Sequence, residues 1–246
     1  MYIVLITALG VGGATIAGAV FGFLFKGISH RFSDHVLSFA SGVMIAASVI
    51  GLILPSIEEG RPSTLLLSLL GIVAGALLIS VIDRAVPHLH GIVGGDSVGD
   101  SADKVLVFVI AIAIHNIPEG LAAGVGFGAE DATSAFMIAS GIALQNLPEG
   151  MVLIAPMLSS GISKGRTFFI ATLTGVVEIV FTVLGYLTVN ISGALLPFFL
   201  SLAGGSMIFV ICDEMIPESH LKNGEKGPSF AVILGFCVML LVDYIF

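Results

Sequence analysis

Charge is scarce in this sequence of 246 residues, and that scarcity indicates the class of protein. Only 11% of the residues are charged whereas 57% are hydrophobic, and the mean hydropathy is +1.11. A composition of this kind is typical of an integral membrane protein. Basic residues are especially few, nine Lys and Arg against 17 Asp and Glu, so a nucleic-acid partner has no electrostatic basis.

Cysteine and one common catalytic motif are also lacking. The two cysteines, Cys212 and Cys237, both fall inside apolar runs, so they do not make a disulfide framework. The zinc-protease motif HExxH is absent. An intramembrane metalloenzyme would need a metal with an open coordination position together with a base or nucleophile. We therefore expect that the protein is not an enzyme.

Long apolar runs are abundant, and about 20 residues suffice to cross roughly 30 Å of hydrocarbon. The first run is a span rather than a signal peptide, because it has no basic start and is too long. We expect an all-α integral membrane protein with one transporter domain over residues 1–246. The sequence predicts eight transmembrane helices, at about 2–25, 36–57, 63–82, 105–127, 132–158, 167–189, 194–216 and 229–246.

Basic residues in the short loops predict the orientation. If the N-terminus is outside, the outer loops carry only Arg61, and eight basic residues lie in the inner loops. We therefore expect a multi-pass protein of the cell (plasma) membrane with both termini extracytoplasmic. The inner basic residues are Lys26, Arg31, Arg84, Lys104, Lys164, Arg166, Lys222 and Lys226.

The longest loop, at about 83–104, is expected to be flexible and cytoplasmic. It contains His88 and His90 among glycines and aspartates. A short histidine-bearing tract can bind a transition metal weakly. A polar linker that happens to contain two histidines is the alternative interpretation.

Two related motifs lie in the middle of adjacent spans. AIHNIPEGLAAG contains His115 and Glu119, and ALQNLPEGMVL follows thirty positions later. His115 and Glu119 are four residues apart, so they face the same way on one helix. Pro118 cannot donate a backbone hydrogen bond, so the carbonyl of Ile114 is left free and the helix bends. Pro148 occupies the same place in the second motif. Kinked helices 4 and 5 would thus form a midmembrane metal site.

Buried carboxylates explain why a metal is expected. A carboxylate near the bilayer midplane costs roughly 2.5 kcal/mol or more, and Glu119 and Glu149 would also repel each other. A divalent cation between them removes both problems, and Glu178, at the middle of the next span, adds a third acid. Mixed nitrogen and oxygen ligands suit zinc, iron, manganese, cobalt or cadmium. His115 argues against calcium and magnesium, which prefer oxygen alone.

Further polar residues mark a pathway across the membrane. Ser48 lies in the second span, where it either binds an ion or, as membrane serines more often do, bonds its own helix. Glu58 lies at the expected external entrance, and Asp213 and Glu214 lie near the cytoplasmic end. The small residues of the first span favour close helix packing, with sliding as the alternative.

Midmembrane ligands, acids at both mouths and small-residue packing together favour a metal transporter. The runner-up is a divalent cation-selective channel, which would need weaker chelation because the ion must leave quickly.

At HNIPEG and QNLPEG the chain resembles the ZIP (Zrt/Irt-like protein) family of divalent metal transporters, and in particular its prokaryotic GufA-like branch. The resemblance implies alternating access, a homodimer, and movement of spans 1, 4, 5 and 6 against 2, 3, 7 and 8. It also implies a binuclear site, with His115, Glu119 and Glu149 on the first ion and Asn116, Glu119, Gln145, Asn146, Glu149 and Glu178 around the second.

Three positions depart from that family pattern. Asn146 stands where some relatives have Asp, which leaves the second ion position one negative charge poorer. Gly51 occupies a position where relatives offer a serine oxygen, so Ser48 or water would have to substitute. Asp213 replaces a histidine of some relatives and makes the exit richer in oxygen.

Overall fold

The computed structural model describes residues 1–24, 30–58, 60–93, 100–128, 132–191, 193–219 and 226–245. Within these ranges the regular secondary structure is helical, as expected. The elements are α1 (Tyr2–Leu24), α2 (His30–Ala46), η1 (Ala47–Ile53), α3 (Leu54–Ile57), α4 (Pro62–Val93), α5 (Asp100–Val125), η2 (Gly126–Gly128), α6 (Ala132–Ser159), α7 (Lys164–Ile191), η3 (Gly193–Leu195), α8 (Leu196–Val210), η4 (Ile211–Met215), α9 (Ile216–Ser219) and α10 (Gly227–Ile245).

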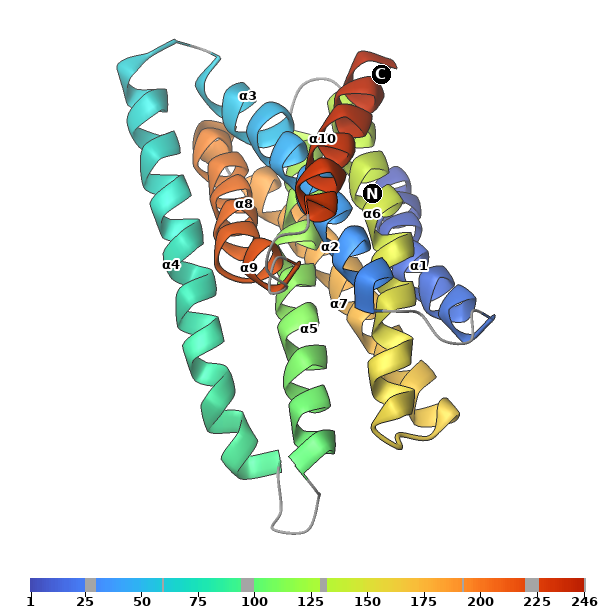
Figure 1. The fold of residues 1–246 in the computed structure, drawn as a ribbon. Coiled ribbons are helices and arrows are strands. Elements are labelled where there is room, and N and C mark those ends of the chain that lie inside the picture. The colour runs from blue at the N-terminus through green and yellow to red at the C-terminus, as the bar shows by residue number, and fades with distance from the viewer. Residues whose placement is uncertain are drawn as a thin grey trace.

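Seven helical stretches among the described residues are long and apolar enough to cross a membrane. They correspond to the predicted spans 1, 2, 3, 5, 6, 7 and 8. The predicted fourth span coincides with α5, whose side chains are described mainly from Val109 onward. The helical membrane fold is therefore confirmed, and the count of eight stays a prediction. Figure 1 places both chain ends in the upper half of the molecule.

Helical backbone extends further than expected into the segment 83–104. α4 continues to Val93 and α5 already begins at Asp100. The loop was expected because of glycines and aspartates that mostly follow residue 90, whereas good helix formers such as Ala85 and Leu89 precede them. The expected flexibility falls largely on residues 94–99, which lie outside the described part of the chain.

The helices pack in two groups, of which α4 and α8 lie on one side in Figure 1 and α1 and α6 on the other. The first bundle consists of α1, α5, α6 and α7, in which α1 contacts α6 and α7, and α5 contacts α7. The second bundle consists of α2 with η1 and α3, α4, α8 with η4 and α9, and α10; here α4 contacts α8, and α2 contacts α10. These contacts are the most extensive in the fold. The family resemblance implied the same two groups of spans, with spans 1, 4, 5 and 6 moving against spans 2, 3, 7 and 8.

Glycines bring helix backbones into contact inside each bundle. A methyl group on Gly12 of α1 would collide with the carbonyl oxygen of Gly175 in α7. Likewise, a methyl group on Gly42 of α2 would collide with the carbonyl oxygen of Val232 in α10. Such contacts let membrane helices approach closely and pack along their length. Of the two interpretations of the small residues in the first span, the structure supports close packing.

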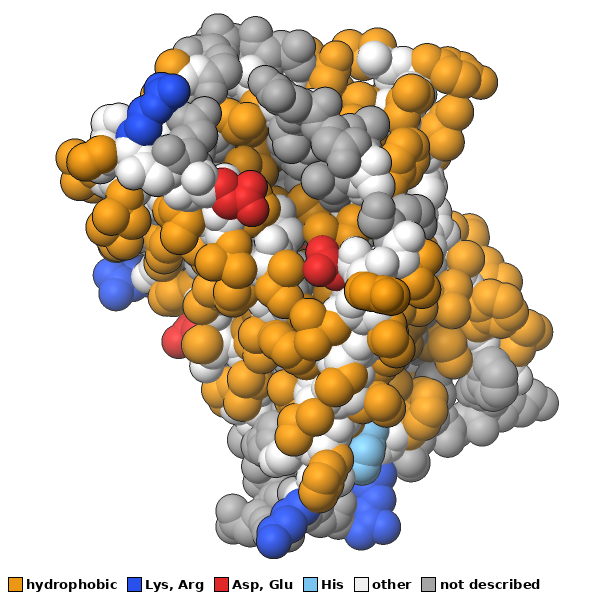
Figure 2. All heavy atoms as spheres, turned by 90° about the horizontal axis from the view of Figure 1, so that it is seen from above, with side chains coloured by type: hydrophobic (Ala, Val, Ile, Leu, Met, Phe, Trp, Pro, Cys, Tyr) orange, Lys and Arg blue, Asp and Glu red, His pale blue; other side chains and the backbone are white. Residues whose placement is uncertain are grey.

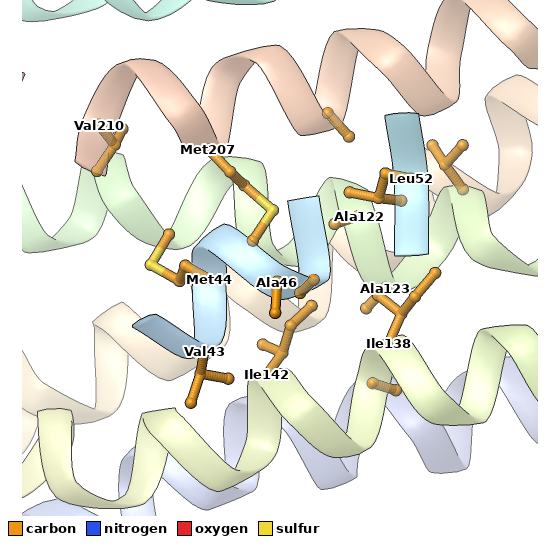
Figure 3. Close-up of a cluster of buried hydrophobic side chains, with 14 of the residues drawn as sticks. Val43, Met44, Ala46, Leu52, Ala122, Ala123, Ile138, Ile142, Met207 and Val210 are labelled. Carbon is orange, nitrogen blue, oxygen red and sulfur yellow. The ribbon is translucent and has the colours of Figure 1, made fainter. Parts of the chain in front are cut away.

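Side chains, rather than backbone, fill the contact between the bundles. A methyl group on Gly51 of η1 would meet the side chain of Ile138 in α6, and one on Gly141 of α6 would meet the side chain of Met239 in α10. The apolar cluster in Figure 3 lies between α2, α5, α6 and α8, with Met207 among its members. The bundles therefore meet through flexible apolar groups.

Two π-helical segments lie within the second bundle, each between two α-helical segments. η1 ends at Ile53, two residues before Pro55, and η4 ends at Met215, two residues before Pro217. A proline ring collides with the carbonyl four residues earlier, and a wider turn ahead of the proline avoids that collision. Pro118, in contrast, lies inside α5, which remains an α-helix throughout, as does α6 around Pro148. The bends predicted at these two prolines stay predictions.

Candidate metal centre

The structure brings the predicted ligands together in the middle of the first bundle. None of their residues is more than 6% exposed, so the centre is buried. Hydrogen bonds or electrostatic interactions connect each of them to another member of the set. They come from α5, α6 and α7, and they are His115, Asn116, Glu119, Gln145, Asn146, Glu149 and Glu178.

Glu178 of α7 is the most completely hydrogen-bonded carboxylate of the centre. Thr15 Oγ1 of α1 and Asn116 Nδ2 of α5 donate to its Oε1, each at 2.6 Å. Asn146 Nδ2 of α6 donates to its Oε2 at 2.5 Å and also contacts the carbonyl oxygen of Val11 at 3.4 Å. This network therefore joins all four helices of the first bundle around one acid.

The paired motifs meet through Glu119 and Gln145. Gln145 Nε2 donates to Glu119 Oε1 at 2.7 Å, so the two antiparallel helices face each other at this depth. Glu149 lies within electrostatic range of both Glu119 and Glu178. The head-to-tail meeting of the two motifs, which their repetition predicted, is thus seen in the structure.

His115 makes a contact that crosses from the first bundle to the second. Its Nε2 lies 2.7 Å from Oε2 of Glu214, which belongs to η4. The other side-chain hydrogen bonds described for the centre stay inside the first bundle. Sequence analysis placed Glu214 near the exit and did not pair it with His115.

Six buried polar atoms around the centre have no hydrogen-bond partner among the described residues. Each can accept a hydrogen bond or bind a cation, because the amide nitrogens and the His115 Nε2 already face acceptors. Buried acceptors without a partner are costly, and one cation can satisfy several of them. The atoms are His115 Nδ1, Glu119 Oε2, Gln145 Oε1, Asn146 Oδ1, Glu149 Oε2 and Glu214 Oε1.

The ligands are arranged in pairs rather than around one point. Among the described residues, no three His, Cys, Asp or Glu side chains converge in the geometry of a metal site. A cation therefore requires side-chain rotations that turn the free atoms, such as Oε2 of Glu119 and Oε2 of Glu149, toward it. Residues of the right chemistry for a cation are present at the centre.

A cavity of about 260 Å³ reaches the centre from one end of the molecule. His115 and Glu149 lie at its inner limit. Its other lining residues include Asp34 near the start of α2, Pro156 near the end of α6 and Glu218 in α9. The cavity therefore opens toward the end of the molecule that the basic residues predict to be cytoplasmic.

An apolar cluster lies between the centre and the opposite end. Ala122 and Ala123 follow the first motif along α5, while Ile138 and Ile142 precede the second motif along α6. Leu52 of η1 packs with them from the second bundle (Figure 3). Seen from above, the described residues of this face are mostly apolar, with a few charged side chains among them (Figure 2).

The predicted pathway residues have different surroundings. Ser48 is buried, and its hydroxyl donates to the Met44 carbonyl of its own helix at 2.6 Å, which is the more common behaviour of a membrane serine. Glu58 is exposed at the end of α3, and Asp213 is exposed in η4. The side chains of His88 and His90 lie outside the described residues.

Two features of the centre have no clear signal in the sequence. Thr15 is one hydroxyl in an apolar run, and nothing about its spacing distinguishes it from Thr7 or from other membrane hydroxyls. The pairing of Glu214 with His115 joins residues 99 positions apart and depends on the π-helical segment η4. Pro217 was the only local indication that this helix is irregular.

The helical membrane fold has a buried centre, and a cavity reaches this centre from one end. The atoms of the centre that lack a hydrogen-bond partner among the described residues are all acceptors. These are the features of the class of cation-transport proteins. Comparison with known proteins is more specific. The family model described as ZIP Zinc transporter matches residues 93–243. The chain belongs to this family, as the paired motifs predicted.

Relatives of several origins cover nearly the whole chain. The zinc transporter GufA of Myxococcus xanthus is 35% identical, over 97% of this chain and 97% of its own. The zinc transporter ZIP11 of Homo sapiens is 30% identical, over 94% and 93%. The zinc transporter ZIPB of Bordetella bronchiseptica is 33% identical, over 94% and 77%. The resemblance to the GufA-like branch is therefore confirmed, and these relatives are named as transporters rather than enzymes.

Proposed function

We propose that this protein carries divalent transition metal ions, zinc foremost, across the membrane into the cytoplasm. The observation that supports this most strongly is the set of buried, unpartnered acceptor atoms on the paired motifs. Three carboxylates at the middle of a membrane protein need positive charge, and a divalent cation supplies it. The relatives' names identify zinc as their cargo, and zinc is the first substrate to test here.

The donor set favours a borderline transition metal. His115 offers a nitrogen, and the remaining donors are carboxylate and amide oxygens. Such a mixture suits zinc, and also iron, manganese, cobalt and cadmium. Cys212 is exposed in η4 and adds no thiolate to the centre. Selection among these metals therefore depends on ligand geometry rather than on a soft ligand.

The centre has ligands for two ion positions, which differ in their expected affinity. His115, Glu119 and Glu149 would hold the first, with their free atoms directed toward it. The second would lie beyond the same two carboxylates, at roughly the 3.5–4 Å separation of two-metal sites. Its added ligands are Asn116, Gln145, Asn146 and Glu178, of which only Glu178 is charged. We expect the first position to bind more tightly.

Transport would proceed by alternating access between the two bundles. The first bundle carries the centre, and its helices are joined by glycine contacts and by the Glu178 network. The second bundle touches it largely through apolar side chains, which can repack as one bundle moves. The cavity at one end and the apolar cluster at the other correspond to a conformation that is open inward.

The two ends of the route are acidic. Glu58 is exposed at the external mouth and would attract cations there. Asp213 and Glu214 would receive the ion on the cytoplasmic side, and His88 and His90 would bind it weakly beyond them. Ser48 would contribute only if its hydroxyl left the Met44 carbonyl. We further propose a homodimer in the cell membrane, with both termini extracytoplasmic, by analogy with the family.

A divalent cation-selective channel is the second candidate, and one observation counts against it. The apolar cluster lies on the outer side of the centre and the cavity reaches the centre from the inner side, which is the arrangement expected of a carrier rather than of a continuous open channel. Saturable, slow uptake would agree with a transporter. Uptake that rises linearly with metal concentration at channel rates would favour the channel.

The proposal is tested by metal competition in proteoliposomes. Purified protein is reconstituted with a metal-sensitive dye and a pH dye inside, and zinc entry is measured with iron, manganese, cobalt or cadmium outside. We expect saturable zinc entry that cadmium inhibits strongly and that magnesium and calcium leave unchanged. Zinc entry equal to that of protein-free liposomes would contradict the proposed function, and the pH dye reports whether protons are coupled.

A further inference from the structure

The two ring nitrogens of His115 face different surroundings. Nε2 lies 2.7 Å from Oε2 of Glu214, while Nδ1 is buried and has no partner among the described residues. An ionised carboxylate only accepts hydrogen bonds, so Nε2 must carry the proton that it donates. In the neutral imidazole the lone pair then lies on Nδ1. The contact with Glu214 therefore selects the tautomer.

A carboxylate on the far nitrogen is the usual support of a metal-binding histidine. It fixes the orientation of the ring and makes the ligating nitrogen more basic. We propose that Glu214 is a positioning residue of the metal centre, which holds the Nε2–H of His115 so that Nδ1 faces the first ion. This inference rests on the proposed function, because it assumes that His115 binds the transported metal.

Because Glu214 belongs to the second bundle, its contact with His115 depends on how the two bundles lie against each other. η4 carries Glu214, whereas His115 belongs to α5 of the first bundle. Displacement of one bundle against the other would separate the two groups and leave His115 without its orienting carboxylate. The affinity of the first ion position would then be higher in the conformation that makes the contact than in one that breaks it.

The surroundings of Glu214 leave His115 as its main stabilising group among those described. Asp83 and Glu218 also lie within electrostatic range of Glu214, and both are acids. Among these groups, only His115 offers Glu214 a hydrogen-bond donor. The second carboxylate oxygen, Oε1, is buried and has no partner among the described residues. Oε1 of Glu214 can bind an ion that leaves His115 and enters the cavity.

A purely structural role for Glu214 is the alternative. In that case the pair only holds the bundles together, and its loss would lower the stability of the fold without changing which nitrogen binds metal. Nuclear magnetic resonance of protein labelled with ¹⁵N-histidine and loaded with ¹¹³Cd²⁺ separates the two roles. In the wild type we expect the ¹¹³Cd–¹⁵N coupling of His115 on Nδ1, and in Glu214→Leu we expect this preference for Nδ1 to be lost. A wild-type coupling on Nε2, or an unchanged Nδ1 coupling in Glu214→Leu, would overturn the proposal.

Binding measurements with variants give the second test. Calorimetry with Cd²⁺ on the purified protein should show binding weakened by roughly 10- to 100-fold in Glu214→Leu, the range for loss of a supporting carboxylate. Glu214→Gln should recover part of this loss, because its amide oxygen still accepts the Nε2–H. Asp243→Asn removes an acid from α10, far along the chain from the motifs, and should bind like the wild type.

The outcomes distinguish this inference from the proposed function. If His115→Ala binds Cd²⁺ as tightly as the wild type, the assigned centre itself is wrong. If His115→Ala loses affinity while Glu214→Leu and Glu214→Gln keep it, only the positioning role fails. Should Glu214→Leu not fold, as thermal unfolding would reveal, Glu214→Gln and the coupling measurement still decide.

Discussion

Glu149 and Glu178 are both buried carboxylates of the first bundle, yet their surroundings are opposite. Glu178 accepts hydrogen bonds from Thr15, Asn116 and Asn146, which come from three other helices. Glu149 lines the cavity, and its Oε2 is buried without a hydrogen-bond partner among the described residues. The difference supports the proposal that Glu149 is available to an ion, and it gives Glu178 a part in holding the bundle together.

This comparison predicts that stability and transport will respond separately to mutation. A carboxylate whose hydrogen bonds are complete contributes to the fold, and its removal leaves donors unsatisfied. A carboxylate without a partner costs free energy in the folded protein, so its removal should do little harm to stability. Variants at the two sites can therefore break or sharpen the distinction.

The largest effect on transport is expected at Glu149 and His115, the two residues of the centre that line the cavity. Glu149→Ala and His115→Ala should each reduce zinc or cadmium uptake in proteoliposomes to the level of liposomes without protein, because each removes a ligand of the first ion. Both variants should remain folded. Glu149→Ala should keep the thermal unfolding midpoint of the wild type within a few degrees, whereas His115→Ala should unfold at a somewhat lower temperature because Glu214 loses its partner. Asp243→Asn is the matched control and should transport normally. Wild-type rates in either ligand variant would refute the assigned centre.

The next largest effect on transport is expected at Glu178. Glu178→Ala should alter the kinetics of uptake, with a changed KM and a reduced rate rather than total loss, because Glu178 serves only the second ion. It should also unfold at a lower temperature than Glu149→Ala, since each buried donor left without a partner costs about 1–3 kcal/mol. Uptake and thermal unfolding are measured on the same preparations. A folded but inactive variant would require a different scheme.

A smaller effect is expected when the second position gains charge. In Asn146→Asp a carboxylate replaces the amide that donates to Glu178, so two acids would face each other. The variant should be less stable than the wild type in metal-free buffer and should gain more thermal stability on addition of zinc. Equal stabilisation by zinc in both proteins would argue that no ion binds beside Asn146.

The smallest effect is expected at Thr15. Thr15→Val removes one hydroxyl donor from Glu178 and should lower the free energy of unfolding by about 1 kcal/mol. Thr15→Ser keeps the donor and should resemble the wild type. Transport rates should change little in both. If Thr15→Val abolished uptake while remaining folded, Thr15 would have to belong to the ion's route.

The sequence predicted the membrane fold and the members of the centre because two physical signals coincide there. Apolar runs of the right length mark the spans, and carboxylates inside such runs need a partner. Repetition of the Pro-Glu-Gly motif in adjacent, antiparallel spans then predicted that the two polar clusters would face each other, and Gln145 Nε2 does donate to Glu119 Oε1.

The remaining features depend on packing that no local pattern encodes. Thr15 reaches Glu178 because glycines of α1 let it lie against α6 and α7. Glu214 reaches His115 from another bundle, through a helix that widens before Pro217. The division into two bundles came only from the family resemblance, because it results from which helices touch and not from the composition of any one helix.

The central claim is that Glu119 and Glu149 share a divalent ion in the middle of the membrane. Anomalous X-ray scattering from crystals grown with cadmium or zinc tests it most directly. We predict an anomalous peak between the two carboxylates, next to His115, at the inner limit of the cavity. Crystals in which the metal binds only at the mouths, with the two carboxylates still turned away from a common point, would contradict the account.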